Sequence, residues 1–370
     1  MSINQKRLIN TFKQLVAIDS ISRAEREMGD YVTQQLQELG LEVQEDNAGE
    51  LIGGNCGNIY GFLPGDPQKE PLLFCVHLDT VEPGKGKQAL VGADGVIRSK
   101  GDTVLGADDA TGVAAVLEAL RAIQENALPH RPLEVLFTVA EEIYCKGIEQ
   151  FNFSRLRSRQ AYVLDLTGPL GTAALRAPTI LTFTVSVRGR SAHAGFAPEQ
   201  GVHAIAAAAA AISELRLGRI DPDTTLNIGL VEGGRATNII PDSCLVTGEV
   251  RSLSHLKALS TAETVRNIFR KEAQSFGAEI EFNTEIQSLA YATAPSHPVV
   301  SRFESVCQQL GLETVLVDTF GGSDNNSLAQ RGITGIVIAN AMHECHSTSE
   351  YTTIVELTGI AGITLALMTD

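Results

Sequence analysis

The chain has 370 residues, which exceeds the size at which one hydrophobic core usually stops growing, so two domains are expected. Hydrophobic residues make up 44% and charged residues 20%, a composition that is typical of folded globular proteins and excludes a disordered chain. The net charge of -15 and the lack of a basic stripe argue against a nucleic-acid partner, because binding to phosphates needs clustered Lys and Arg.

The sequence also indicates where the protein works. Its six cysteines are scattered without a CxxC pair, unlike a disulfide framework or a structural zinc site, and fit a reducing cytoplasm. Residues 1–20 lack the basic-then-apolar layout of a signal peptide. The longest strongly apolar stretch, residues 204–212, is much shorter than the ~20 residues of a membrane helix. We therefore expect a soluble, cytoplasmic protein without a membrane partner.

The first forty residues are predicted to form two amphipathic helices, the second of which ends at Gly40. Apolar residues recur at helical spacing in both: Leu8, Phe12, Leu15 and Val16 in the first, then Met28, Tyr31, Val32, Leu36 and Leu39 in the second.

Four later segments share one pattern, in which a short apolar run of strand length ends in an acidic residue or a histidine, the last being followed by the histidines of MHECH. They are residues 72–79, 133–142, 161–166 and 334–340. Such runs are typical of a sheet covered by helices on both faces, and a helical pattern at 113–123 lies between the first two. Because ligands of open α/β sheets bind beyond the carboxyl ends of the strands, these four ends are predicted to meet at one site.

Between residues 178 and 289 the pattern changes to strands with one solvated face. We expect a strand at 181–188, a helix from Pro198 to Leu217, strands near 226–231 and 244–251, a helix near 254–276 and a strand at 278–282. This βαββαβ order is the ferredoxin-like unit. We interpret residues 178–289 as a lid domain inserted into an α/β catalytic domain, a mixed sheet sandwiched by helices, made of residues 1–177 and 290–370.

Residues of the types that occur in metal sites stand at the predicted strand ends or in turns that open a helix. They are His77, Asp79, Asp108, Glu141, Glu142, Asp165 and His346. Paired catalytic zinc sites use such nitrogen and oxygen ligands and hold the ions ~3.5 to 4 Å apart, usually with a shared carboxylate. Each residue alone has a structural explanation, as Asp108 could cap a helix. Together, polar groups after buried runs would be costly unless paired or bound to metal, so the set indicates a metal site.

The order of these motifs resembles the co-catalytic zinc peptidases, a family that includes peptidase T, carboxypeptidase G and aminoacylase. The matching motifs are H-x-D at 77–79, G-A-D-D at 106–109, E-E at 141–142, the later Asp165 and H-x-x-x-E at 346–350. The resemblance spans nearly the whole chain and includes GRSAHAG at 189–195 and GGRATNIIP at 233–241. The segment FGGSDNNSLAQRG at 320–332 is most similar to the peptidase T branch.

Carried over to this chain, the resemblance implies two zinc ions, with manganese or cobalt as substitutes. His77, Asp108 and Asp165 would bind one ion. Asp108, Glu142 and His346 would bind the other, so that Asp108 would bridge them.

The resemblance further implies that Glu141 stays free of metal and moves the proton. Zinc ions make water a usable nucleophile but cannot carry a proton to the departing nitrogen, so a neighbouring carboxylate must do so. Asp79 would accept a hydrogen bond from His77 and thereby select its tautomer. A cis peptide bond is implied between Asp108 and Asp109.

In the lid domain, His193 resembles the residue that stabilises the oxyanion of the tetrahedral intermediate, often across a dimer interface. Asn238 and Arg251 resemble residues that hold the substrate backbone or carboxylate. The lysine that often follows the family's Asp-Asp motif is replaced by Ala110, which leaves the subgroup open. The lid offers a surface for a homodimer, and a monomer is the alternative.

The leading hypothesis is a metallopeptidase that acts on short peptides, an aminopeptidase for tripeptides. A carboxypeptidase or an N-acyl amino acid deacylase would share the metals and bind the other end of the substrate, and the sequence barely separates them. A non-catalytic peptide-binding protein on the same fold is a third hypothesis. Glu141 argues against it, because a binding module needs no proton carrier.

Overall fold

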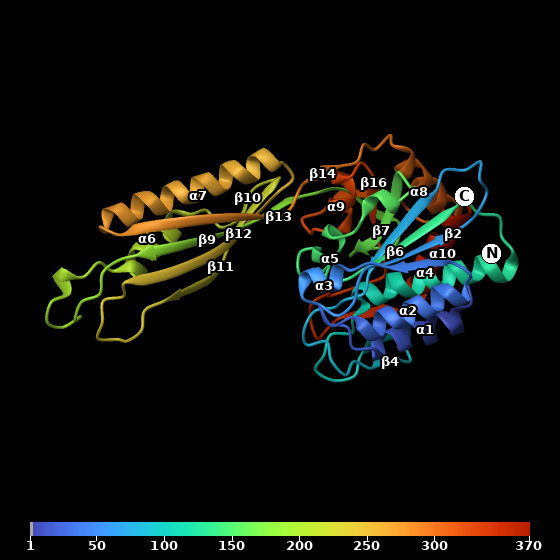
Figure 1. Cartoon of the computed structure of the whole chain (residues 1–370), viewed down its shortest axis with the longest axis horizontal. Coiled ribbons are helices and arrows are strands. Elements are labelled where there is room, and N and C mark those ends of the chain that lie inside the picture. Colours follow the sequence, from blue (N-terminus) through green and yellow to red (C-terminus); the bar gives the residue numbers. More distant parts are fainter. Residues whose placement is uncertain (1–2) are drawn as a thin grey trace. The chain divides into compact units, whose positions relative to one another are not determined.

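The computed structural model describes residues 3–370 and divides into two compact units. The first, here called the core unit, runs up to Leu175 and continues through Ala292–Asp318 and Ser323–Asp370. The second, called the inserted unit, comprises Arg176–Tyr291 and Thr319–Gly322. The predicted fold class is confirmed: a mixed sheet between helices carries an inserted ferredoxin-like unit (Figure 1).

The core unit contains most of the helices. They are α1 (Gln5–Ala17), α2 (Arg26–Glu38), α3 (Ala48–Ile52), α4 (Ala107–Asn126), α5 (Lys146–Glu149), α8 (Pro298–Gln309), α9 (Asp324–Gln330) and α10 (Ile354–Thr369). The two N-terminal helices that the apolar spacing predicts are therefore confirmed.

A sheet runs through the core unit in the order β1-β2-β6-β3-β7-β16-β8-β14, with β15 paired to β8. Its strands are β1 (Glu42–Glu45), β2 (Ile59–Leu63), β3 (Leu72–His77), β6 (Leu133–Thr138), β7 (Gln160–Leu166), β8 (Thr172–Ala177), β14 (Tyr291–Ala292), β15 (Val315–Asp318) and β16 (Thr334–Ala339). A smaller sheet joins β4 (Ala89–Val91), β5 (Val96–Ser99) and β17 (Tyr351–Thr353).

The four predicted buried runs form the central strands β6, β3, β7 and β16, which are mutually parallel. Their carboxyl ends therefore share one edge of the sheet, as the sequence predicts. Successive side chains of a strand point to opposite faces of the sheet, so these buried runs present apolar side chains on both faces. Helices cover both of these faces. Phe74 of β3 packs in the cluster beneath α4, whereas the neighbouring Cys75 contacts Asp324 of α9.

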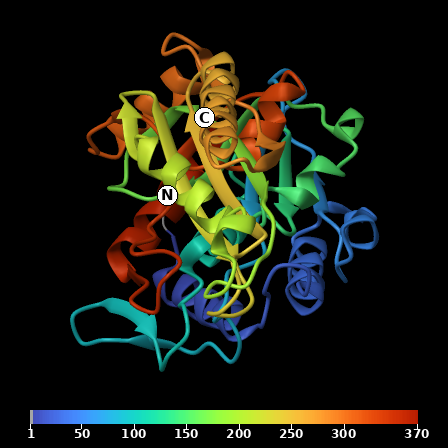
Figure 2. The same cartoon turned by 90° about the vertical axis from the view of Figure 1, so that its left-hand side faces the viewer.

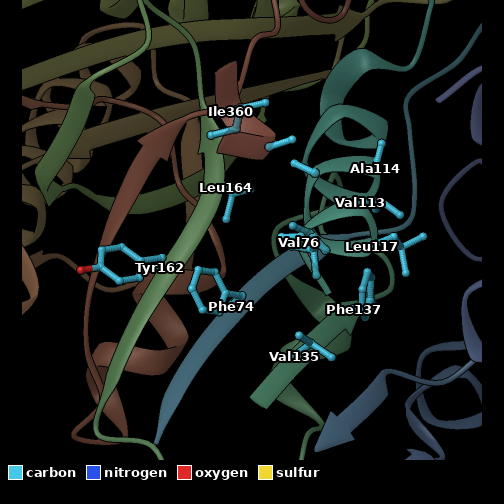
Figure 3. Close-up of a cluster of buried hydrophobic side chains, with 14 of the residues drawn as sticks. Phe74, Val76, Val113, Ala114, Leu117, Val135, Phe137, Tyr162, Leu164 and Ile360 are labelled. Carbon is cyan, nitrogen blue, oxygen red and sulfur yellow. The ribbon is translucent and has the colours of Figure 1, made fainter. Parts of the chain in front are cut away.

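A large apolar cluster lies between α4, α10 and the central strands (Figure 3). It includes Phe74, Val76, Val113, Ala114, Leu117, Val135, Phe137, Tyr162, Leu164 and Ile360. Every one of these side chains is nearly inaccessible to solvent, and burial of each large one stabilises the fold by about 1.5 to 3 kcal/mol. The rigid strands therefore provide fixed positions for the polar residues at their ends.

The inserted unit is a five-stranded antiparallel sheet in the order β10-β11-β12-β9-β13. Its elements are β9 (Thr179–Arg188), α6 (Ala204–Glu214), β10 (Gly218–Asp221), β11 (Thr224–Gly233), β12 (Ser243–Ser252), α7 (His255–Ser275) and β13 (Glu279–Ser288). The helices α6 and α7 pack on each other and on the same apolar face of this sheet (Figures 1 and 2). The βαββαβ order is thus confirmed, with β10 as an additional edge strand.

One predicted helix differs in the structure. The expected helix from Pro198 to Leu217 is interrupted, because a 3-10 turn at Pro198–Gln200 is followed by extended backbone at Gly201. The helix α6 begins only after His203, whose Nδ1 atom accepts a hydrogen bond from the backbone N–H of Ala206 and so caps the first turn.

Candidate metal centre

The candidate ligands come from five neighbouring parts of the core unit. His77 is the last residue of β3, and Asp165 lies near the end of β7. Asp108 stands at the start of α4, while Glu142 follows β6 and His346 lies in the loop after β16. The parallel arrangement of the central strands thus brings together residues that are up to 269 positions apart, from 77 to 346.

The carboxylate of Asp108 lies between the two histidines. Its Oδ1 atom is 2.9 Å from Nε2 of His77, and its Oδ2 atom is 3.4 Å from Nε2 of His346. Nε2 of His346 is also 2.9 Å from Oε2 of Glu142. Each oxygen of Asp108 therefore faces a different half of the centre, which is the arrangement that a bridging carboxylate requires.

Three groups of ligand atoms within residues 3–370 are close enough to hold an ion, and two of them include His77. Atoms of His77, Asp108 and Glu142 lie within 4.8 Å of one another, and so do atoms of His77, Glu141 and Asp165. The structure therefore places Asp165 beside His77. Glu141 is itself a member of this group with His77 and Asp165.

The buried carboxylates of the centre favour the binding of positively charged ions. Burial, together with neighbouring carboxylates, raises the pKa of Asp165 and of Glu141 well above the usual range. Burial also raises the pKa of Glu142, whose Oε1 atom is buried without a hydrogen-bond partner among the described residues. Hydrogen bonds to Asp108 and Glu142 raise the pKa of His346 to about 10.

Such a cluster of buried carboxylates is costly unless cations neutralise it. The nitrogen and oxygen donors, and the unpartnered oxygen of Glu142, fit divalent metal ions.

Asp79 has a different role from the expected one. The Nδ1 atom of His77 is 2.9 Å from the backbone carbonyl oxygen of Asp79, whereas the Asp79 carboxylate is 3.6 Å away. The carbonyl therefore selects the tautomer of His77. The carboxylate of Asp79 instead accepts hydrogen bonds from the backbone N–H groups of Glu141 and Glu142 and from the hydroxyl of Ser22. Asp79 thus holds the turn that carries both glutamates.

Two further carboxylates, Glu350 and Asp109, position the ligands through hydrogen bonds. Glu350 is buried and accepts hydrogen bonds from the N–H groups of Gly106 (2.6 Å) and Asp108 (3.0 Å). Asp109 accepts one from the N–H group of His77 (3.1 Å) and one from the side chain of Asn340 (2.6 Å). In the sequence, the sign that these two residues support the site is that Glu350 ends the H-x-x-x-E motif and Asp109 ends the G-A-D-D motif. The peptide bond between Asp108 and Asp109 is cis, as expected.

Comparisons with known proteins identify the family of this chain. A peptidase dimerisation domain matches residues 177–276, and the peptidase family M28 matches residues 58–213. The uncharacterised protein YqjE of Bacillus subtilis is 33% identical over 100% of this chain and 99% of its own length. A tripeptidase from Staphylococcus aureus has a TM-score of 0.97 at 32% identity, covering 100% of this chain and 99% of its own. The chain belongs to the peptidase T family.

Two other solved structures extend this comparison. The aminopeptidase PepT from Bacillus cereus has a TM-score of 0.92 at 36% identity, covering 99% of this chain and 98% of its own. A dinuclear metal-binding peptidase of the M20 family from Bacillus subtilis has a TM-score of 0.74 at 18% identity, covers 99% of this chain and 97% of its own, and shares the fold. This member of the peptidase T family is therefore a metallopeptidase. None of its helices within residues 3–370 is long and apolar enough to cross a membrane.

The remaining expected residues of this metallopeptidase lie in the inserted unit. His193 and Asn238 are exposed and adjacent, because the N–H group of Ala194 donates to the carbonyl of Asn238. Arg251 stands at the other end of β12, where its guanidinium pairs with Glu249. His193 and Asn238 thus share one loop region, and Arg251 does not.

Proposed function

We propose that this chain is a zinc-dependent aminopeptidase that removes the N-terminal residue of tripeptides. The observation that carries the proposal is the centre in which Asp108 lies between His77 and His346 with Glu141 beside it. The full-length similarity to a tripeptidase and to the aminopeptidase PepT supports the choice of substrate.

In this proposal, His77, Asp108 and Asp165 bind one zinc ion. Asp108, Glu142 and His346, whose imidazole lies beside both carboxylates, bind the other. Mixed imidazole and carboxylate donors suit zinc, and manganese or cobalt with the same donors are the alternatives. When bound, the two ions would activate a water molecule and polarise the scissile carbonyl group.

Glu141 carries the proton in the proposed reaction. Its carboxylate takes a proton from the attacking water as the oxygen bonds to the carbonyl carbon. It then delivers that proton to the nitrogen as the carbon–nitrogen bond breaks. Asp79 keeps Glu141 at the reacting groups through the backbone hydrogen bond of 2.9 Å. His193 would stabilise the oxyanion, and Asn238 and Arg251 would bind the substrate.

A panel of three peptides tests the substrate assignment. We expect a free tripeptide to be cleaved with kcat/KM about 100-fold or more above that of its N-acetylated form, because a site that binds the ammonium group leaves polar groups unpaired when it is blocked. The tripeptide amide, blocked at the other end, is the control and should be cleaved about as well as the free peptide. Rates are measured by chromatography of the products.

The second candidate is a carboxypeptidase. A probable carboxypeptidase from Arthroderma gypseum is 28% identical over 67% of this chain and 59% of its own length. In the same panel a carboxypeptidase would cleave the N-acetylated peptide and leave the amide intact. Cleavage of only the acetyl group would instead identify a deacylase.

We further propose a homodimer formed through the inserted unit, in the reducing cytoplasm. All six cysteines are free. The strand β10 pairs with β11 only as far as Leu226, so the rest of β11 has a strand partner on one side only, within the described residues. Leu230 and Val231 on this open edge are 62% and 52% exposed. An unpaired edge with exposed apolar residues is a template for pairing with a second copy.

Light scattering after size exclusion tests the dimer. The wild-type chain should elute as a dimer, and Leu230→Asp should shift it towards the monomer because a charge is placed in the apolar contact. Val355→Asp is the matched control, since Val355 is 77% exposed in the core unit and should leave the dimer intact. A monomeric wild type would contradict the proposal.

A further inference from the structure

The loop that carries Glu141 folds back on that residue. The N–H group of Cys145 donates to the backbone carbonyl of Glu141 at 2.7 Å. The thiol of Cys145 donates to Oε1 of the Glu141 side chain at 3.1 Å. In this loop the backbone of Ala140, Tyr144 and Cys145 has positive φ angles of 53°, 70° and 55°. Residues other than glycine rarely adopt this conformation, and such strain gathers at functional sites.

The thiol of Cys145 lies among buried carboxylates. Ligand atoms of Glu141, Cys145 and Asp324 are all within 4.8 Å of one another, and Asp324 is only 2% exposed. The Oδ2 atom of Asp324 accepts a hydrogen bond from the hydroxyl of Thr138, whereas its Oδ1 atom has no partner among the described residues. Electrostatic repulsion between Glu141 and Asp324 would favour movement of the Glu141 carboxylate away from this position.

We propose that Cys145 is a positioning residue for Glu141, whose thiol proton holds the carboxylate in place beside the metal centre against the repulsion of Asp324. The inference rests on the proposed role of Glu141 as the proton carrier. The hydrogen bond occupies Oε1 and leaves the other oxygen of the carboxylate for the proton transfer.

A buried thiol suits this task. Burial, reinforced by Glu141 and Asp324, raises the pKa of Cys145 well above that of a free thiol, so the group stays a neutral donor. Cys145 is not among the proposed ligands, so its removal should alter the position of Glu141 without emptying the metal sites.

Kinetics of two substitutions test the proposal. Cys145→Ala should lower kcat about tenfold, the effect of losing one hydrogen bond to a charged group, with KM unchanged within about twofold. Cys145→Ser keeps an O–H donor and should recover most of the loss. Cys307→Ala is the matched control, because Cys307 is a fully buried cysteine of α8 and its loss creates a similar void. Metal content, measured by mass spectrometry, should be equal in all four proteins.

A double substitution tests the electrostatic repulsion between the carboxylates of Glu141 and Asp324. Asp324→Asn in the Cys145→Ala background should raise kcat again, because the amide removes the charge and can donate to Glu141. Equal losses in the alanine and serine variants, or a change in KM alone, would overturn the positioning role.

Infrared spectroscopy tests the hydrogen bond without activity. The S–H stretching band that is missing in Cys145→Ala should move to higher frequency in Glu141→Ala, where the acceptor is gone. A band that stays in place would overturn the inference. Because this readout needs no substrate, a failed peptide panel with a shifted band would reject the proposed function and leave the contact intact.

Discussion

Glu141→Gln is expected to lower kcat by about 10²- to 10⁴-fold, the usual contribution of a positioned proton carrier. Glutamine has the same shape and can still accept the hydrogen bond from Cys145, but it cannot take a proton from water. Steady-state kinetics with a free tripeptide measure the loss. The metal content should remain at two equivalents, because Glu141 is proposed to bind no ion.

Two companion variants make this result specific. Glu149→Gln changes an exposed glutamate of the neighbouring helix α5 and should leave kcat unchanged. Glu142→Gln should lose metal, because Oε2 of Glu142 lies 2.9 Å from Nε2 of His346 in the proposed second site. If Glu141→Gln lost metal and kept its rate while Glu142→Gln did the reverse, the two glutamates would have exchanged roles.

Asp108→Ala is expected to abolish activity and to weaken the binding of both ions, since the residue is proposed to be shared. Substitution of Asp165, by contrast, should weaken one site. Loss of binding is measured by titration with zinc while the free metal is buffered. Asp102→Asn, in the exposed segment before α4, is the control and should bind two equivalents.

Thermal unfolding gives the same test without substrate. Metal that binds only the folded state should stabilise the wild type by about 2.7 kcal/mol at a free concentration of roughly 100 Kd, and a chelator should reverse the gain. The midpoint of Asp108→Ala should respond far less to metal at that concentration. Equal stabilisation of both proteins would contradict the assignment of Asp108 as the bridge.

Much of the core unit follows from local sequence patterns. The four central strands were predictable because each is an apolar run of strand length, and a run buried on both faces tolerates few polar residues. The polar residues at their ends stood out for the same reason. The break before α6 was not predictable from the apolar pattern, because it depends on how the side chain of His203 caps the helix.

The residues that position the metal ligands could be identified only from the tertiary structure. Asp79 was expected to contact His77 through its carboxylate, but the carboxylate reaches the backbone of Glu141, 62 residues away in sequence. Glu350 holds the turn before Asp108 across 242 residues. Sequence spacing carries no information on such distances, which depend on how loops from different strands pack at the edge of the sheet.

By itself, then, the sequence determined the fold class and the order of the strands along the chain, and it indicated the candidate metal ligands, because burial and strand periodicity are local properties of the chain. Only the tertiary structure decided that Asp108 faces both histidines, that the backbone of Asp79 orients His77 and that the thiol of Cys145 reaches Glu141. Hydrogen bonds depend on atomic distances of about 3 Å, and these are set by packing between segments that are remote in sequence.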